Sequence, residues 1–240
     1  MSIKIMLKVS KLFKSFNNKM IIKNISFDVT DNSIVGILGK NGAGKTTLLG
    51  MLMGLISPSS GEINVFGRNL KNHKNEILKK INFQSPYIDL PKKMTVEQNL
   101  FFYSRLYGVK YFKDVVDDLV KNLQMNDLLK KNYGSLSAGQ KTKVNLCKAL
   151  LNTPKLLLLD EPTASLDPET SIFIRDFLVN YKRLHKSSII ITSHNLDEIQ
   201  SICSEIILLK SGEIDSQGNL EFLLQRNNYS SLEEFFLGQG

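Results

Sequence analysis

The segment from Gly39 to Thr47 follows the pattern G-x-x-x-x-G-K-[ST], in which glycines let backbone N–H groups turn inward around a polyphosphate. Within it, Lys45 can reach the β- and γ-phosphate oxygens, and the hydroxyl of Thr46 can bind Mg²⁺. A helix that begins here adds partial positive charge at its N-terminus. The alternative is a glycine-rich turn that only caps a helix. Because all the specified residue types are present, we expect a nucleotide-binding loop.

Two acidic residues and a histidine elsewhere in the chain could act on the same phosphate. Asp160 and Glu161 come directly after the apolar run Leu156–Leu159. In phosphate-loop ATPases an aspartate at such a strand end holds the water shell of Mg²⁺, and a glutamate after it can polarise an attacking water. His194 lies two residues past the stretch Ile189–Thr192, where it could contact the γ-phosphate. The alternatives are acids that simply begin a surface loop and a histidine with a structural role.

The acidic residues and the histidine can reach the phosphate loop only if a sheet brings the ends of their strands together. The hydrophobic patterns of the sequence predict such a sheet. Ile34–Leu38 is an apolar run of strand length before the loop, and Thr46–Leu55 has helical spacing after it. Leu156–Leu159 is apolar on both faces, as a buried parallel strand should be. The alternation continues with a helix over Glu169–Leu184 and strands over Ser188–Thr192 and Glu205–Leu209. This order predicts a mostly parallel sheet.

The first part of the chain predicts an antiparallel β layer. Apolar and polar residues alternate from Lys4 to Val29, and Asn17-Asn18 offers a turn. The alternation returns over Glu62–Phe66, so we expect this strand to join the same layer. Ile81–Gln84 resembles one more short strand, which ends in a polar residue.

A helical segment interrupts the strands. From Thr95 to about Lys131 the periodicity is helical. Capping-box spacing occurs at Thr95-Val96-Glu97-Gln98 and again at Ser137-Ala138-Gly139-Gln140, and the second box opens a helix that Asn152-Thr153-Pro154 ends. We therefore expect a helical insertion within an α/β frame.

Composition narrows the classes of protein that the chain can represent. Its 240 residues are 42% hydrophobic, which is ordinary for a globular protein. No apolar run approaches the roughly 18 residues of a membrane span, and Met1–Lys19 lacks the apolar region of a signal peptide, so we expect a cytoplasmic protein. Cys147 and Cys203 lack metal-ligand spacing and are expected to be small buried thiols.

The net charge of +8 raises the question of nucleic acid. The lysines are scattered and form no dense block interleaved with aromatic residues, so no nucleic-acid partner is expected. The alternatives are a solvated lysine-rich surface and proximity to an anionic membrane leaflet.

Taken in order and spacing, these motifs resemble the ATPase subunit of an ATP-binding cassette (ABC) transporter, and in particular an export-type (ABC-2-like) cassette. The resemblance extends from Val9 to about Gly218, and its most specific part is the signature Leu136–Gln140. The phosphate loop and the acidic strand are shared by many NTPases, kinases and GTPases. The motifs that support the resemblance are Gly39–Thr47, Gln84, Leu136–Gln140, Leu156–Glu161, Ser165–Asp167 and His194.

The resemblance implies an α/β P-loop NTPase fold with a RecA-like core, an antiparallel β subdomain and an inserted helical subdomain. The whole chain, residues 1–240, would be a single ABC ATPase domain. The core and β subdomain would occupy about 1–85 and 152–218, the helical subdomain about 86–151, and a short C-terminal tail 219–240.

The resemblance also implies ATP and Mg²⁺ as cofactors and assigns residues to them. The catalytic residues would be Glu161, His194, Lys45 and Gln84, and the metal would be bound by Thr46, Gln84 and Asp160. In this pattern Phe16 stacks on adenine and Asp167 couples two sites, although Phe16 could instead be a core aromatic residue. The nucleotide-binding residues would be Phe16, Gly39, Asn41, Gly42, Ala43, Gly44, Lys45, Thr46, Thr47, Ser137, Gly139, Gln140 and Asp167.

The chain departs from the family pattern at several positions. Ala138 stands where the signature usually has a second glycine, which places a methyl group near the phosphate approach. Lys141 and Lys143 replace a more usual Gln or Arg pattern. The family pattern therefore does not define the contacts that these two positions make with the second nucleotide site. Asn32-Ser33 replaces a usual turn glycine, but asparagine is competent in turns. None of these changes removes a catalytic group.

Such subunits pair head to tail, so that ATP on one phosphate loop meets the signature of the other subunit. The resemblance thus implies a second ABC ATPase subunit, identical or different, and a separate transmembrane permease subunit. The permease would dock near Gln84 and Tyr87–Phe102 and hold the chain on the inner face of the cell membrane. The ending Ser231–Phe236, with no added regulatory domain, resembles export-type cassettes.

Two other classes of function compete with transport. A soluble ABC ATPase acting in repair, translation or cluster assembly would usually carry a second cassette, a coiled coil, zinc-binding cysteines or long insertions, and none is seen. A P-loop kinase would not need the signature. A GTPase would need an Asn-Lys-x-Asp segment after a sheet strand to recognise guanine, and the sequence has no such segment there. We therefore expect an ATPase that powers transport, with export as the expected direction.

Overall fold

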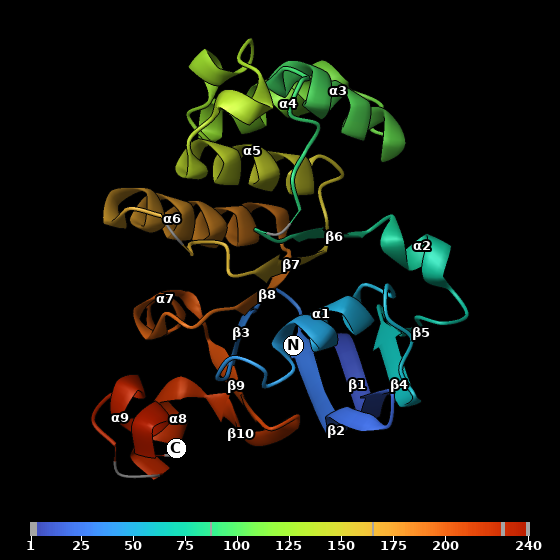
Figure 1. Ribbon diagram of the computed structural model, residues 1–240, viewed down its shortest axis with the longest axis vertical. Helices are drawn as coiled ribbons and strands as arrows, with labels where there is room; N and C mark the ends of the chain where they lie inside the picture. Colours follow the sequence, from blue (N-terminus) through green and yellow to red (C-terminus); the bar gives the residue numbers. More distant parts are fainter. Residues whose placement is uncertain (1–3, 87, 165, 227–228, 239–240) are drawn as a thin grey trace.

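A computed structural model describes residues 4–86, 88–164, 166–226 and 229–238 of the chain. Figure 1 shows a small sheet with α1 beside it, a larger sheet running through the centre, and helices α3, α4 and α5 at the opposite end from the C-terminus. Two residues named in the sequence motifs, Tyr87 and Ser165, lie outside the described part.

The first sheet is antiparallel, as the alternating pattern predicts. It consists of β1 (Ile5–Phe16), β2 (Lys19–Thr30), β4 (Ser60–Val65) and β5 (Arg68–Asn69) in the order β2-β1-β4-β5. Asn17 and Asn18 form the turn between β1 and β2 with φ of 46° and 63°. Positive φ at both turn residues matches the right-handed twist of the two strands, and asparagine tolerates it.

The second sheet has the order β10-β9-β3-β8-β7-β6. Its neighbouring strands from β9 through β6 pair in parallel, and only β10 is antiparallel to its neighbour. The prediction of a mostly parallel sheet is therefore confirmed. The strands are β3 (Ile34–Leu38), β6 (Ile81–Gln84), β7 (Leu156–Asp160), β8 (Ser188–Thr192), β9 (Glu205–Lys210) and β10 (Glu213–Asn219).

The helices follow the periodic segments of the sequence. Thr95 and Ser137 each form a complete capping box at the start of α3 and α5, as predicted. The helices are α1 (Lys45–Leu52), α2 (Lys74–Leu78), α3 (Val96–Leu106), α4 (Phe112–Asn122), α5 (Ala138–Leu150), α6 (Pro168–His185), α7 (Leu196–Ile202), α8 (Leu220–Arg226) and α9 (Leu232–Gly238), with 3₁₀ turns at Asn126–Leu128 and Tyr133–Ser135. None of the helices in the described ranges is long and apolar enough to span a membrane.

The larger sheet separates two hydrophobic cores. Alternate residues of β7 point to opposite sides, so Leu156 and Leu158 belong to the core shared with α1 and the antiparallel sheet, while Leu157 and Leu159 belong to the core of α3–α6. This is why the run of leucines has no polar face. Cys147 and Cys203 are buried in the second of these cores as free thiols, as predicted, and burial raises the pKa of both.

One helix is shorter than its sequence pattern indicates. The spacing of leucines predicts a helix over Thr46–Leu55, but α1 ends at Leu52 and Gly54 takes φ of +64°. Leu55 is consequently 70% exposed and does not extend the apolar face of the helix. A glycine with positive φ after the last turn is a frequent helix terminator, and here it overrides the periodicity.

Helix α9, which the hydrophobic pattern did not predict, packs against the hydrophobic core that contains residues of α3–α6. Leu232 and Phe235 are fully buried there, and the ring of Phe235 packs edge-on against Tyr229 with 5.7 Å between centroids. The C-terminal segment is therefore part of the folded unit.

We expect Phe235→Ala to lower the free energy of unfolding by about 3–5 kcal/mol, because it leaves a cavity in a packed core. Phe222→Ala is the matched control: this side chain on α8 is exposed, so a change within about 0.5 kcal/mol is expected. Urea unfolding followed by circular dichroism measures both. Equal, small effects for the two variants would contradict the packing of α9.

Candidate active site

The phosphate loop lies between the end of β3 at Leu38 and the start of α1 at Lys45. Gly44 caps the helix with φ of +105°, and a Cβ there would lie 2.7 Å from Cδ1 of Ile22. Gly42 takes φ of +82°, which also favours glycine. The glycines thus let the backbone turn around an open space in front of the helix N-terminus, as predicted.

The side chain of Lys45 closes over this loop. It is buried, and its Nζ donates to the carbonyl oxygen of Gly39 at 2.6 Å. A cavity of about 590 Å³ lies beside the ammonium group and is wide enough for a nucleotide phosphate chain. It is lined by Lys19, Met20, Ile21, Lys23, Asn41, Gly42, Ala43, Gly44, Lys45, Thr46, Thr47, Asp160, Glu161 and Ser211.

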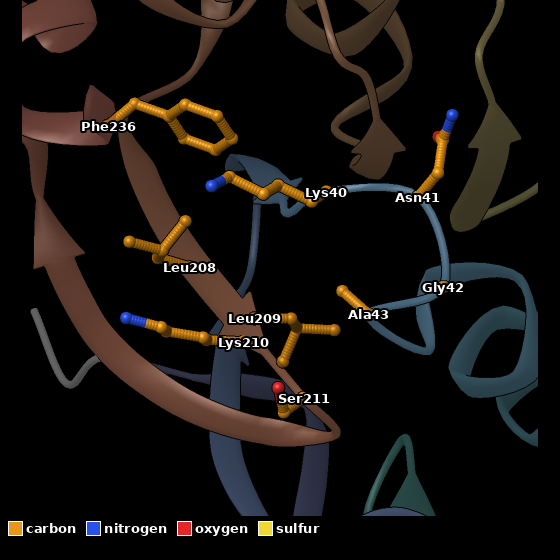
Figure 2. Close-up of a pocket in the computed structure, with 9 residues that line it drawn as sticks. All are labelled: Lys40, Asn41, Gly42, Ala43, Leu208, Leu209, Lys210, Ser211 and Phe236. Atoms are coloured by element: carbon orange, nitrogen blue, oxygen red, sulfur yellow. The ribbon is translucent and has the colours of Figure 1, made fainter. Parts of the chain in front are cut away.

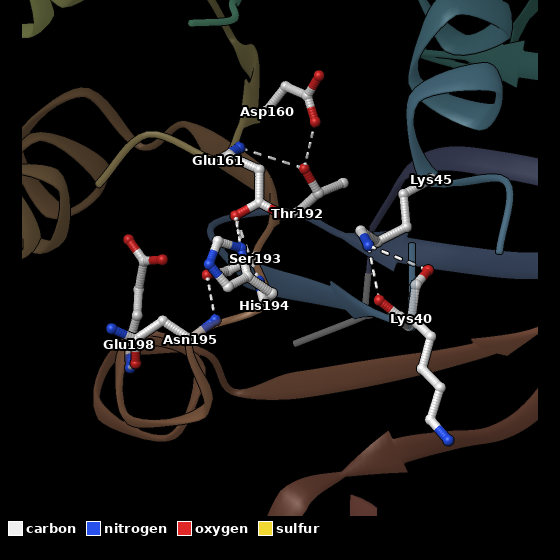
Figure 3. Close-up of polar contacts among 10 residues, drawn as sticks. Lys40, Lys45, Asp160, Glu161, Thr192, Ser193, His194, Asn195 and Glu198 are labelled. Carbon is white, nitrogen blue, oxygen red and sulfur yellow. Dashed lines mark hydrogen bonds and ion pairs between the residues drawn. The ribbon is translucent and has the colours of Figure 1, made fainter. Parts of the chain in front are cut away.

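The buried carboxylate of Asp160 is oriented by hydroxyl groups from two neighbouring strand ends. The Oγ1 of Thr192 donates to its Oδ1 at 2.7 Å, and the Oγ of Ser85 donates to its Oδ2 at 3.3 Å. Figure 3 shows the first of these contacts. Because β7 pairs with β8 in a register that sets Asp160 opposite Thr192, the sheet itself positions this acid.

Glu161 and His194 form a pair at the same edge of the sheet. Nδ1 of His194 lies 2.6 Å from Oε2 of Glu161, and the backbone N–H of His194 donates to the same oxygen at 3.3 Å (Figure 3). The side chain of Glu161 is 15% exposed and that of His194 is 67% exposed. The sequence places these residues 33 positions apart, and the structure brings them into contact.

Glu161 also has an uncommon backbone conformation. Its φ is +48°, which costs free energy in a residue other than glycine. Its N–H donates to the carbonyl oxygen of Thr192 at 3.0 Å, and this contact holds the residue in place. The strained turn directs the carboxylate toward His194 rather than along the direction of β7.

Gln84 ends β6 opposite Leu159 of β7, one residue before Asp160, and its side chain is buried. Its Oε1 has no hydrogen-bond partner in the described part of the chain. Thr46 and Asp160 line the phosphate cavity together, and Gln84 lines the neighbouring cavity that also borders Glu161 and His194. Oxygen ligands and an unpaired buried acceptor are suited to a hard cation such as Mg²⁺. The oxygen donors present therefore fit the predicted metal.

The signature residues lie at the exposed start of α5. Ser137 accepts the backbone N–H of Gln140 at 3.2 Å, and Oε1 of Gln140 accepts the N–H of Ser137 at 3.1 Å. The N–H of Gln140, one of the residues expected to bind the nucleotide, is therefore already engaged by this capping box. None of Ser137, Gly139 and Gln140 lines the cavity at the phosphate loop.

Phe16 and Asp167 lie apart from the phosphate cavity. Phe16 is 45% exposed at the end of β1, and the ammonium of Lys14 lies 4.6 Å from its ring centroid. Exposure argues against a core aromatic residue at this position. Asp167 caps α6 by accepting the N–H of Thr170 at 2.8 Å, and this hydrogen bond lowers the pKa of the carboxyl.

Some residues around the site carried no recognisable signal in the sequence. Thr192 and Ser85 orient Asp160, but hydroxyl residues at strand ends are too common to be singled out. Phe236 of α9 borders a cavity of about 300 Å³ together with Lys40–Ala43 and Leu208–Ser211. Figure 2 shows its ring pointing from α9 toward the start of the phosphate loop.

A phosphate loop between a central parallel strand and a helix, with an aspartate and a glutamate at the end of another parallel strand of the same sheet, defines the class of P-loop nucleotide-binding ATPases. Comparison with known proteins narrows this class. Residues 22–164 match the family described as ABC transporter.

Individual relatives agree with this match. The chain is 34% identical over 221 residues to the ABC transporter ATP-binding protein NatA of Bacillus subtilis, covering 91% of this chain and 89% of that protein. It is 30% identical to a Nod factor export ATP-binding protein I of Rhizobium, covering 98% and 78%. Among solved structures, cbiO1 from Clostridium perfringens, described as part of the ABC transporter complex cbiONQ, is 28% identical with a TM-score of 0.80 over 98% of this chain and 99% of that one. The chain belongs to the ABC transporter family, as an ATP-binding subunit and an ATPase.

We expect Lys45→Ala to weaken ATP binding by at least about tenfold, because hydrogen bonds from a charged donor each contribute about 1.5–3 kcal/mol. Fluorescent-nucleotide titration would measure the change. Lys113→Ala, which changes an exposed lysine on α4, should leave the affinity unaltered. Unchanged affinity in Lys45→Ala would contradict the assignment of the phosphate loop.

Proposed function

We propose that ATP is bound between two ATPase subunits, with each nucleotide on one subunit's phosphate loop and the other subunit's signature. The observation that supports this arrangement is the start of α5, where Ser137 is exposed and where Ser137, Gly139 and Gln140 do not line the cavity beside Lys45. Ala138 between them borders a separate cavity of about 620 Å³ with Gly39, Lys40 and Asn41. A helix N-terminus binds anions, so this surface is suited to a γ-phosphate held by a neighbour. The partner subunit is a second ABC ATPase, a copy of this chain or a different one.

Within each site the residues divide the chemistry. Lys45 and the loop backbone from Gly39 to Thr47 bind the phosphates. Glu161 accepts a proton from the attacking water, and His194, held by Glu161, contacts the γ-phosphate. Phe16 stacks on adenine and Asp167 couples the two sites.

Thr46, Gln84 and Asp160 bind Mg²⁺ in this proposal. The ion would neutralise charge that develops on the phosphate oxygens. Asp160 is held for this task by the hydroxyls of Thr192 and Ser85, and Gln84 adds an acceptor that is otherwise unpaired.

The chain is organised in this proposal as one ABC ATPase domain with three parts. The core and β subdomain occupy about 1–85 and 152–218, the helical subdomain about 86–151 and the tail 219–240. The two hydrophobic cores on opposite faces of the larger sheet support a division between the β side and the helical side.

ATP binding and hydrolysis by the two subunits power transport through a separate transmembrane permease. This permease keeps the chain on the inner face of the cell membrane. Exposed apolar side chains of Ile88, Phe101 and Phe102, close in sequence to Gln84, offer it an apolar surface. We propose export as the direction, from the resemblance of the C-terminal segment and the Nod factor relative. A relative named for import matches the chain at similar identity, so a transport assay decides this point.

We expect Glu161→Gln to bind Mg-ATP and to hydrolyse it at least about 100-fold more slowly, because the amide cannot accept the proton. A dimer should then accumulate with ATP on size-exclusion chromatography. The matched control, Glu221→Gln on the surface of α8, should turn over normally. Normal turnover in Glu161→Gln would remove this residue as the general base.

We expect a tagged form of the chain, extracted from its own cells with mild detergent, to co-purify a polytopic membrane protein. Mass spectrometry identifies the partner. A triple variant with Ile88, Phe101 and Phe102 changed to serine should lose it while keeping its affinity for ATP. Retention of the partner by this variant would place the docking surface elsewhere.

A further inference from the structure

Glu198 is a buried acid that the reaction described above does not use. It lies in α7, four residues after His194, and is only 1% exposed. Neither of its carboxyl oxygens has a hydrogen-bond partner in the described ranges. Since a buried polar group without a partner is costly, its presence behind the Glu161–His194 pair calls for an explanation.

The surroundings of Glu198 connect the two loops that carry this pair. Ser193 directly precedes His194, and Thr163 follows Glu161 by two residues. Both residues are buried, and with Glu198 they line a cavity of about 390 Å³ that also borders Glu161 and His194. Figure 3 shows Glu198 on the side of His194 that faces away from Asp160.

The two hydroxyl groups stand near the carboxyl and favour its ionised form, although neither is in hydrogen-bonding geometry with it. The Oγ of Ser193 accepts the N–H of Asn195 at 2.9 Å, which leaves its own proton to donate. A small movement of both loops toward the carboxyl would therefore give Glu198 one hydrogen-bond donor on each side.

We propose that Glu198 is a positioning residue of the ATPase reaction, whose carboxyl can accept the hydroxyl protons of both Ser193 and Thr163 and so hold His194 and Glu161 at the spacing that pairs them. It acts through these neighbours and does not touch the nucleotide. The inference rests on the proposed roles of Glu161 and His194, which the Glu161→Gln variant tests separately.

The groups around Glu198 shift the pKa of its carboxyl in opposite directions. Burial raises the pKa of its carboxyl and the charge of Glu161 adds to this, while Ser193, Thr163 and Arg175 of α6 lower it. Burial raises the pKa of the Cys203 thiol, and the charge of Glu198 adds to this. Asp197 and His194 border the same cavity.

The raised pKa has a consequence for stability. The folded state holds the proton to a higher pH than the unfolded chain, so this carboxyl makes the protein less stable as pH rises above its unfolded pKa of about 4.3. A glutamine at this position removes that dependence. Glu198→Gln should therefore gain thermal stability relative to the natural protein on going from pH 5 to pH 8.

The test compares steady-state ATP hydrolysis by Glu198→Ala and Glu198→Gln, with Asp197→Ala as the exposed neighbouring control. If Glu198 positions the pair, the alanine variant loses about tenfold or more in kcat with KM for ATP changed less than twofold. The glutamine variant keeps at least half of kcat, because its amide fills the same space and can accept both hydroxyl protons. Asp197→Ala keeps the full rate.

Three outcomes would overturn the proposal. An unchanged kcat in the alanine variant removes any role in turnover. An equal loss in the alanine and glutamine variants indicates that the ionisable proton, not the shape and hydrogen bonding, is required. A loss of folded protein with normal kcat per folded molecule indicates a structural role only.

If the alanine variant does not fold, Thr163→Val keeps the proposal testable. This change removes one hydroxyl at nearly constant volume, and we expect it to lower kcat about threefold or more with little change in KM. Thr163→Ser, which keeps the hydroxyl, is the matched control and should retain at least half of kcat. An equal loss in the valine and serine variants would contradict a role for this hydroxyl.

Discussion

The hydrogen bond between Thr192 and Asp160 is the contact on which the site depends. It forms because β7 and β8 lie side by side in parallel, with these two residues in register at the carboxyl ends. In a parallel sheet every strand delivers its last residues to one edge, so groups far apart in sequence meet there. The run of leucines in β7 contributes to this geometry, because a strand that is packed on both faces fixes the position of the acid at its end.

Directly after that strand end, the backbone of Glu161 takes an uncommon conformation. The positive φ of Glu161 turns its carboxylate away from the path of β7 and into contact with His194. The cost of this conformation is offset by the N–H of Glu161 bonding to Thr192. One residue of β8 thus orients both neighbouring acids, which makes the relation between Asp160 and Glu161 a property of the sheet rather than of the loop that follows.

The sequence predicted elements well where one local pattern decided the structure. The asparagine turn, both capping boxes and the buried strand Leu156–Leu159 follow from residue type and spacing. Helix α1 was predicted too long because Gly54 ends it against the leucine periodicity. The contacts of Ser85, Glu198 and Phe236 could not be predicted, since each depends on the pairing of distant segments that leaves no local pattern.

The signature illustrates how a local cap orders the hydrogen-bond donors at the start of a helix. The capping box uses the oxygen of Ser137 for the N–H of Gln140, so that N–H is not available to a phosphate without opening the box. The hydroxyl proton of Ser137 and the N–H groups of Ala138 and Gly139, which make no hydrogen bond in the described part of the chain, remain at the exposed end of α5. The cap therefore fixes the direction of these donors before any nucleotide arrives. The start of α5 is therefore ordered by its own chain, and Ala138 borders a cavity of about 620 Å³ that it shares with Gly39, Lys40 and Asn41 of the phosphate loop.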